Sequence, residues 1–401
     1  MAPVNDQFKS FTKTLRESLF AYFFDVGGIF AGAIVASQLS IMQFSPWIIA
    51  IYPAVLSAKG MIGGLLSGRL STALHIGTIY PKLFGNTKSF YKLYQAIIAL
   101  TLITSLTISM VSIIFGNQFW GINFSDFYDI VTVVLATMSM GLAFTLVSTI
   151  VAFVTFKKGL DPDILVYPIM STVADLGITT CYVLVLNLFF LYDQTGKEVV
   201  LAIGIFQIIL VLWILARNVH DREFSKTIKE SLLTIFLVAF IVNITGTILN
   251  RINEIVEGRK EIYTVYPALI DTIGDVGSVI GSTATTKIAL GLIGSSFKFM
   301  KHHAPQILGA WISSAIMFMF FSALSLIINN MLTLDMFLRF SYILLASNII
   351  AVIAISIVSL TISVITYKRG LDPDNFVVPI ESSLADTITS VALFIVLLLA
   401  G

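Results

Sequence analysis

The sequence KKGLDPDILVYPIMSTVAD, which begins at Lys157, recurs without a gap as KRGLDPDNFVVPIESSLAD, which begins at Lys368. A second, looser pair is formed by YPAVLSAKGMIGGLLSGRLST from Tyr52 and YPALIDTIGDVGSVIGSTATT from Tyr266. Self-similarity at a fixed spacing is the signature of a repeat architecture. The chain is therefore predicted to be a tandem duplication.

The composition around these repeats is that of a membrane protein. The chain has 401 residues, of which 57% are hydrophobic and 12% charged, and its mean hydropathy is +0.94. A helix that crosses a bilayer needs about 20 mostly apolar residues. The segments that meet this requirement are 17–43, 51–79, 90–115, 127–156, 163–191, 199–217, 226–250, 263–294, 304–330, 335–366 and 374–399. We predict an all-α polytopic membrane protein with about eleven transmembrane helices, of which glycine and polar residues interrupt the second and eighth.

The number of spans determines whether the two repeats have the same or opposite orientation in the membrane. Each repeat holds five spans, and one additional span at 199–217 links them, so the two repeats should lie parallel in the membrane. A solute path along the axis between parallel repeats would be lined by matching residues of both. The predicted organisation is a short cytoplasmic N-terminus at 1–17, a first repeat at 18–192, a linking helix and cytoplasmic loop at 193–225, and a second repeat at 226–401.

Lysine and arginine residues lie mostly in alternate loops, among them those that follow the fourth and tenth spans. Cytoplasmic loops carry an excess of these residues. We therefore predict a multi-pass protein of the cell membrane, with its N-terminus in the cytoplasm and its C-terminus outside. The lipid bilayer is its expected surrounding, and no nucleic-acid partner is expected.

Ionisable side chains at bilayer depth are costly to bury and mark functional sites by default. The predicted spans contain Asp25, Asp175, Asp271, Asp275, Glu381 and Asp386, against Lys59, Arg69 and Lys287. This excess of acidic residues favours a cation as the solute.

Asp175 and Asp386 occupy matching positions of the two repeats. Each lies four residues after a serine, Ser171 or Ser382, so that hydroxyl and carboxylate share one helix face. A proline three residues before each serine removes a helical N–H and can leave a carbonyl oxygen free. Carboxylate, hydroxyl and carbonyl oxygens suit Mg²⁺, which is usually held by one or two carboxylates and several waters. We predict that the two aspartates face each other and bind Mg²⁺; in the alternative interpretation, each hydrogen-bonds a neighbouring helix.

Three further aspartates are candidate cation ligands. Asp271 and Asp275 lie four residues apart, on one helix face, and could form an outer vestibule or could pair with a lysine instead. Asp25 has Asn243 as its counterpart in the second repeat, since each precedes a glycine by three residues. The sequence favours equally an Asp25 side chain that faces the cation path and one that does not.

Small residues and the Asp-Pro pairs have structural interpretations. Gly60, Gly64 and Gly68, like Gly277 and Gly281, have the GxxxG spacing that permits close helix approach. In each GLDPD stretch, the first aspartate is expected to cap a helix that begins at the following proline.

Other chemistry finds little support in the sequence. The single cysteine and the few scattered histidines argue against a dedicated zinc or copper carrier, and no phosphate-binding loop indicates ATP-driven pumping. We expect no catalytic residue, no bound cofactor and no enzymatic activity. An intramembrane aspartyl protease is the alternative from the enzyme class, because it also uses two embedded aspartates. Its Y-D and G-x-G-D motifs are not matched, since the nearest stretch, TIGD at 272–275, lacks the first glycine.

These stretches resemble the MgtE superfamily of magnesium channels and transporters, in particular its solute carrier family 41 branch, in which two MgtE-type units are fused. The most specific pieces are YPAVLSAKGMIGGLLSGRLSTALHIG at 52–77 and the two DPD…P…S…AD stretches. The resemblance implies Mg²⁺ transport through a pore between the units, with Asp175 and Asp386 at the cation site. The family's K-G-N reads Lys59-Gly60-Met61 here, and the second unit's G-G-N ends in Asp275, so methionine and a carboxylate stand where the family has amides.

We therefore predict a channel or transporter for Mg²⁺ or a related divalent cation, with Mg²⁺ as the transported ion. An exchanger that couples Mg²⁺ to Na⁺ or H⁺ is the alternative within transport. The fused repeats supply both sides of a pore, so a monomer could suffice for transport. A homodimer is also compatible with the sequence.

Overall fold

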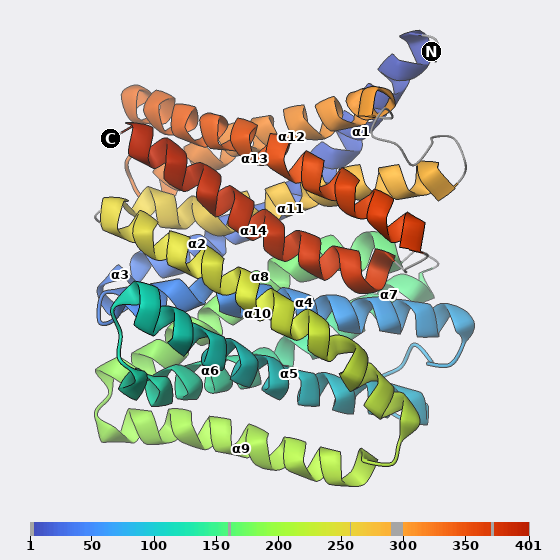
Figure 1. Cartoon of the computed structure of the whole chain (residues 1–401), viewed down its shortest axis with the longest axis vertical. Helices are drawn as coiled ribbons and strands as arrows, with labels where there is room; N and C mark the ends of the chain where they lie inside the picture. The colour runs from blue at the N-terminus through green and yellow to red at the C-terminus, as the bar shows by residue number, and fades with distance from the viewer. Residues whose placement is uncertain (1–3, 159–161, 257, 290–299, 370–372, 401) are drawn as a thin grey trace. The chain divides into compact units, whose positions relative to one another are not determined.

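The computed structural model describes residues 4–158, 162–256, 258–289, 300–369 and 373–400, and each element assigned in those ranges is a helix. In chain order the elements are α1 (Val4–Tyr22), η1 (Phe23–Asp25), α2 (Val26–Ser37), α3 (Leu39–Met42), α4 (Pro46–Ile76), α5 (Lys88–Phe115), η2 (Gly116–Trp120), η3 (Phe124–Asp126), α6 (Phe127–Gly141), α7 (Ala143–Lys157), α8 (Pro162–Leu191), α9 (Gln194–Asn218), α10 (Arg222–Val256), α11 (Lys260–Ala289), α12 (Met300–Ile328), α13 (Leu334–Arg369) and α14 (Pro373–Ala400) (Figure 1). The all-α prediction is confirmed for these residues.

Ten helical stretches within the described residues are long and apolar enough to cross a membrane. They correspond to ten of the eleven predicted spans, and the exception is the eighth. Its helix, α11, carries Asp271 and Asp275 near its middle, and these two residues lower its mean hydropathy. At 1.5 Å per residue, its 30 residues reach about 45 Å, which exceeds the hydrocarbon core of about 30 Å. The helix is thus long enough to span, but its aspartates need polar surroundings inside the protein.

The helices that carry the paired aspartates begin where the sequence predicts. α8 begins at Pro162 and α14 at Pro373. Proline suits the first turn of a helix, because the N–H that it lacks has no partner there in any case. The caps predicted at Asp161 and Asp372 lie outside the described residues.

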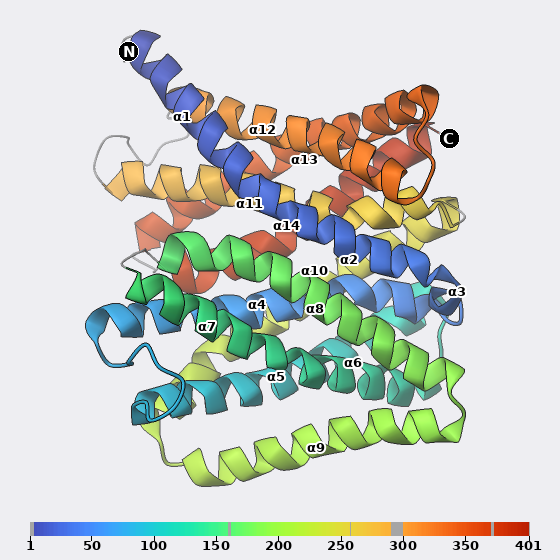
Figure 2. The same ribbon diagram turned by 180° about the vertical axis from the view of Figure 1, so that it is seen from behind.

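The chain divides into two compact units. The first, called the split unit, combines Met1–Ser37 with Arg251–Gly401; the second, called the continuous unit, is Gln38–Asn250. In the split unit, α11 lies in contact with α2, α12, α13 and α14, and α1 packs on α12 (Figures 1 and 2). In the continuous unit, α8 packs on α4, α6 and α7, and α9 covers α5 and α6.

The first helix of each sequence repeat thus lies in a unit with helices of the other repeat. α1 and α2 open the first repeat but belong to the split unit, and α10 opens the second repeat but belongs to the continuous unit through Asn250. The sequence repeats and the compact units therefore have different boundaries. The first span of each repeat, α1–α2 or α10, belongs to the unit that holds the rest of the other repeat.

Glycines allow the exchanged helices to approach their new partners closely. A Cβ atom added at Gly28 or Gly32 of α2 would collide with the backbone of α11, at Ala268 and Thr264 respectively. One added at Gly246 of α10, the counterpart of Gly28, would collide with the backbone of α4. In each unit, a glycine of the exchanged helix therefore meets the backbone of the helix that carries the YPA stretch, as expected where helices associate through close packing.

The GxxxG interpretation is supported in the second repeat. At Gly277 of α11, a Cβ atom would come within 2.8 Å of the Glu381 carboxylate, and at Gly281 it would touch that carboxylate at 3.4 Å. In the first repeat, a Cβ atom at Gly60 of α4 would meet no atom of the described residues within 4 Å, so the prediction of close packing is wrong at that position. The side-chain surroundings of Gly68 lie outside the described residues.

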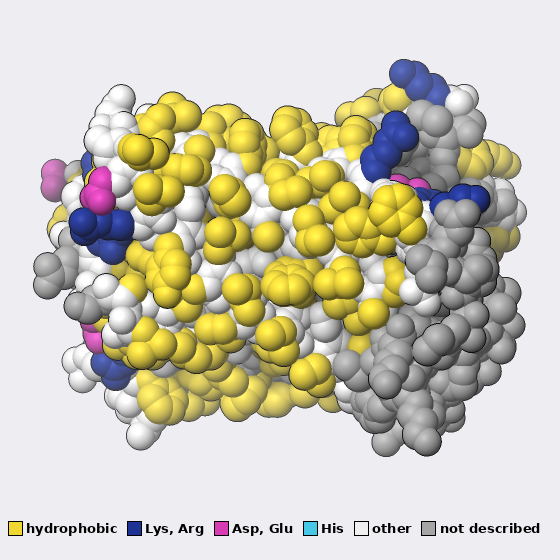
Figure 3. All heavy atoms as spheres, turned by 90° about the horizontal axis from the view of Figure 1, so that it is seen from above, with side chains coloured by type: hydrophobic (Ala, Val, Ile, Leu, Met, Phe, Trp, Pro, Cys, Tyr) yellow, Lys and Arg dark blue, Asp and Glu magenta, His cyan; other side chains and the backbone are white. Residues whose placement is uncertain are grey.

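The outer surface of the helices is apolar along their middle. Figure 3 shows a face formed largely by α12 and α13 of the split unit, on which hydrophobic side chains cover the centre and charged side chains gather at the ends. The exposed hydrophobic side chains of these two helices include Ile312, Ile316, Met319, Phe320, Ile349, Ile350, Ile353 and Ile357. This distribution fits helices that face lipid at their centre and water at their ends.

Replacing Gly32 with alanine is expected to lower the thermal unfolding temperature, because the new Cβ would press on the backbone at Tyr263 and Thr264. Overpacking of this kind costs about 1–3 kcal/mol. Gly60→Ala is the matched control, since its Cβ enters open space and alanine favours a helix by about 1 kcal/mol. Both variants can be compared in detergent by thermal unfolding, and equal temperatures for the two would contradict the proposed contact.

Candidate functional site

The two predicted cation ligands lie at equivalent places in different units. Asp175 is on α8 of the continuous unit and Asp386 is on α14 of the split unit. Their side chains are buried, with 8% and 7% of their surface exposed, and both interact with neighbouring groups. A buried carboxylate is costly unless a compensating group or a cation accompanies it.

A matching hydrogen bond fixes each aspartate-bearing helix. The hydroxyl of Tyr52 on α4 lies 3.0 Å from that of Thr179, one turn after Asp175 on α8. In the split unit, the Tyr266 hydroxyl lies 2.8 Å from that of Ser390, one turn after the second aspartate on α14. The Ser390 hydroxyl donates in turn to the backbone oxygen of Asp386, at 2.7 Å. Sequence reasoning missed these residues, although the tyrosines head the recurring YPA stretch.

The continuous unit adds a second hydrogen bond between the same two helices. Tyr182 on α8 is fully buried, and its hydroxyl donates to the backbone oxygen of Ile48 on α4 at 2.6 Å. Its ring also stacks on Tyr52, with ring centroids 5.9 Å apart. Because Leu393 stands at the matching position of α14, the split unit has no equivalent of this bond.

The serines predicted to share the cation site are only partly described. Ser382 on α14 is half-buried, whereas the side chain of Ser171 lies outside the described residues. The residue before Ser382 is Glu381, whose carboxylate is 5% exposed and accepts a hydrogen bond from Ser359 of α13. This acid therefore fills the space beside the glycines of α11 and holds α11, α13 and α14 together.

Asp25 lies against α11. It ends η1, the single 3₁₀ turn that separates α1 from α2, and its side chain is 7% exposed. The hydroxyl of Thr272 on α11 donates to one carboxylate oxygen of Asp25 at 2.6 Å. The structure thus places Asp25 beside the helix that carries the other two candidate aspartates.

Asp275 joins the same group of side chains. The hydroxyl of Tyr22 on α1 lies within electrostatic reach of the carboxylates of Asp275 and Asp25. Tyr22 is fully buried, and its hydroxyl lies close to that of Ser18, one turn earlier. Within the described part of the chain, neither hydroxyl has a partner at hydrogen-bonding geometry. We refer to Ser18, Tyr22, Asp25, Thr272 and Asp275 as the polar cluster of the split unit.

The remaining predicted residues have separate environments. Asp271 is half-buried on α11, one turn before Asp275, and interacts with a neighbouring group. Of its two predicted lysine partners, the side chain of Lys287 lies outside the described residues. Lys59 belongs to the continuous unit, where it is 4% exposed on α4 and lies near Cys181 of α8.

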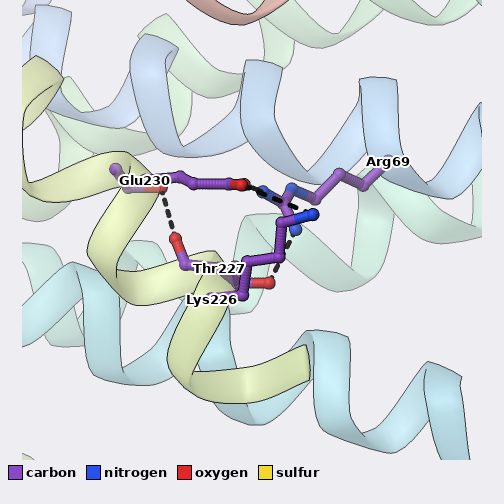
Figure 4. A network of polar contacts seen from close by, with 5 residues as sticks. Arg69, Lys226, Thr227 and Glu230 are labelled. Atoms are coloured by element: carbon purple, nitrogen blue, oxygen red, sulfur yellow. Dashed lines mark hydrogen bonds and ion pairs between the residues drawn. The ribbon is translucent and has the colours of Figure 1, made fainter. Parts of the chain in front are cut away.

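Arg69 is tied to α10 at one end of α4, within the continuous unit. Its guanidinium donates to the Thr227 hydroxyl at 2.6 Å and lies 3.4 Å from the carboxylate of Glu230, which also pairs with Lys226 (Figure 4). Half of the Glu230 side chain is exposed, and exposed pairs contribute only about 0–1 kcal/mol. This network therefore joins α4 to α10 at the polar end of these helices but contributes little to their stability.

Few carboxylate side chains lie close enough together in the described structure to act as ligands of one cation. Within the described part of the chain, no three His, Cys, Asp or Glu side chains are placed together to hold a metal ion. One or two carboxylates supplemented by hydroxyl, carbonyl and water oxygens are the ligands typical of Mg²⁺.

Comparison with protein families gives a match to the MgtE family, described as a divalent cation transporter, at residues 52–185 and again at residues 266–396. The two matches together cover more than half of the chain. They contain the two buried aspartates with their tyrosine partners and leave out the exchanged helices α1, α2 and α10. No curated protein and no solved structure matches the chain.

Tyr52→Phe and Tyr266→Phe are each expected to lower the thermal unfolding temperature by a similar amount, because each removes one buried hydrogen bond worth about 1 kcal/mol. Tyr342→Phe is the control, since Tyr342 on α13 is 69% exposed. Thermal unfolding of the three purified variants tests this. If only one of the two buried tyrosines mattered, the two bonds would not be equivalent.

Proposed function

Because the chain belongs to the MgtE family of divalent cation transporters, we propose that it carries Mg²⁺ across the membrane and that Asp175 and Asp386 bind the ion together. The observation that supports this most directly is the recurrence of one buried aspartate at the same position of both family matches. Each is followed, one turn later, by a hydroxyl that a tyrosine of the YPA stretch holds in place.

The chemistry of the pair favours a hydrated divalent ion. Two carboxylates that approach each other in a low-dielectric region repel, and a divalent cation between them removes that repulsion. Mg²⁺ gives up its water reluctantly, so it is expected to pass with several waters that the Ser171 and Ser382 hydroxyls help to orient. Hard oxygen ligands also disfavour ions that prefer sulfur or nitrogen.

The cation path is proposed to run between the two parallel repeats, with the N-terminus in the cytoplasm. Asp271, half-buried on α11, is proposed to line the outer entrance to this path. A membrane potential contributes about 2.3 kcal/mol per charge per 100 mV, which acts twice on a divalent ion and drives it inward. Uptake of this kind needs no second substrate.

Asp175→Asn and Asp386→Asn are each expected to lower Mg²⁺ uptake more than about tenfold, because a neutral amide cannot compensate the charge of the ion and even supporting residues of a metal site contribute that much. The measurement is Mg²⁺ entry into proteoliposomes that contain a Mg²⁺-sensitive dye. Asp335→Asn is the control, since this aspartate is 68% exposed and pairs with Arg339 at the surface. Undiminished uptake by both single variants and by the double variant would refute the proposed role of the pair.

Mg²⁺ uptake into the same proteoliposomes also distinguishes passive transport from coupled exchange. We expect uptake to follow an imposed membrane potential and to be unchanged by an imposed Na⁺ or pH gradient, because a passive path responds only to the electrochemical gradient of Mg²⁺. Uptake that required a Na⁺ gradient or a pH gradient would instead show coupled exchange.

A further inference from the structure

We propose that the polar cluster of the split unit is a second cation-binding site, for which the continuous unit has no equivalent. It would take one hard cation, Na⁺ or Mg²⁺, through carboxylate and hydroxyl oxygens. The site uses other side chains than Asp175 and Asp386, and the proposal does not depend on the role of those two aspartates in transport.

The first support is the chemistry of the groups that meet there. Asp25 and Asp275 come from different helices, and both carboxylates act on the hydroxyl of Tyr22. Asp25 is buried and Asp275 is half-buried. Carboxylates that lie close together away from water repel unless positive charge compensates them. The Thr272 hydroxyl, which donates to Asp25, adds a further oxygen atom to the cluster.

The second support is a pair of buried hydroxyls. Tyr22 is 0% and Ser18 2% exposed, and within the described residues neither hydroxyl oxygen has a partner at hydrogen-bonding geometry. The Tyr22 hydroxyl lies close to that of Ser18 and within electrostatic reach of both carboxylates. Buried polar atoms almost always have a partner, and an exception calls for a bound ion, a water or another explanation. In the proposed site, the cation is held by the carboxylates and takes the hydroxyl oxygens as further ligands.

The third support is the helix interruption at the same place. η1 separates α1 from α2 at Phe23–Asp25, within a stretch that is otherwise long and apolar enough to span the membrane. A short 3₁₀ segment inside a helix often marks a functional position, and interrupted spans form ion sites in many transporters. The corresponding helix of the continuous unit, α10, is one unbroken α-helix from Arg222 to Val256.

The continuous unit lacks the polar groups at the matching positions. When Gly28 is paired with Gly246, Phe236, Phe240 and Asn243 stand in place of Ser18, Tyr22 and Asp25. When Tyr52 is paired with Tyr266, Ala58 and Met61 stand in place of Thr272 and Asp275. The counterpart of Asp25 is already satisfied, because Asn243 accepts a hydrogen bond from Ser112 at 2.7 Å and donates to a backbone oxygen of its own helix.

The surroundings of the matching positions also differ. Phe236 and Phe240 of the unbroken α10 are 58% and 49% exposed, whereas their counterparts Ser18 and Tyr22 are buried. α1, which carries Ser18 and Tyr22, packs on α12 within the split unit. A 3₁₀ turn has 3.0 residues per turn in place of 3.6, so η1 also rotates the residues before it relative to those after it.

The test uses the full-length Asp175→Asn/Asp386→Asn double variant, which removes the proposed transport pair. Its thermal unfolding temperature is measured in detergent against increasing MgCl₂, NaCl or choline chloride. We expect a saturable rise with MgCl₂ or NaCl and none with choline chloride, because a ligand that binds only the folded state stabilises it. The salt that gives the rise identifies the ion. Adding Asp275→Met, which installs the residue of the matching position, is expected to abolish the rise.

Tyr22→Phe, in the same double variant, separates ion binding from a structural role. Its hydroxyl has no partner at hydrogen-bonding geometry among the described residues, so the unfolding temperature without the cation should be unchanged or higher. The apparent affinity for the cation should fall about tenfold, as for the loss of one supporting group of a metal site. Tyr182→Phe is the matched control: it is equally buried, but its hydroxyl donates to Ile48, so it should lower the unfolding temperature and leave the cation affinity unchanged.

Two results would overturn the proposal. One is the lack of any saturable effect of MgCl₂ and NaCl on the double variant. The other is a Tyr22→Phe variant that loses stability without the cation, as Tyr182→Phe does, and keeps its affinity. Full Mg²⁺ uptake by the transport-pair variants would refute the proposed function and leave both of these measurements valid.

Discussion

Helices inside a bilayer gain little from hydrophobic burial against each other, because lipid tails are as apolar as the side chains. Their association depends on close packing of small residues and on hydrogen bonds between helices. Both are found at the contacts that define this fold: Gly28 and Gly32 bring α2 onto α11, and Gly246 brings α10 onto α4. The tyrosines of the YPA stretches then fix α8 and α14 through their hydroxyls. The aspartates are held in place by these contacts.

The sequence predicts the helices well, because hydropathy and the Asp-Pro starts are local signals. It also identifies the two aspartates, since duplication displays them at matching positions. It does not predict the exchange of the first helices, which depends on the surface that each helix meets in space. Gly60 shows the same limit: a GxxxG pattern permits close approach, but only the tertiary structure determines whether a partner is there.

The polar cluster was hidden from sequence reasoning for a related reason. Asp25 and Asp275 were visible as charged residues in apolar spans, but Ser18 and Tyr22 are common residues whose burial depends on the helix against which α1 packs. Their counterparts on α10, Phe236 and Phe240, are exposed. The informative signal was the difference between the repeats, in which polar residues of one copy stand opposite apolar residues of the other.

Fusion of the two repeats into one chain is what permits such a difference. In a homodimer of identical repeats, each substitution would appear twice, so a polar cluster could not be gained on one side alone. In the fused chain, the aspartates and the tyrosine hydrogen bonds recur in both copies, whereas Asp275 and Met61 have diverged at one position. Features that recur in both repeats fit a role that the two repeats share, whereas residues that have diverged can take a role in one repeat alone. A cation site built from residues of one repeat alone, as proposed for the polar cluster, is therefore a feature that a homodimer of identical repeats could not have on one side only.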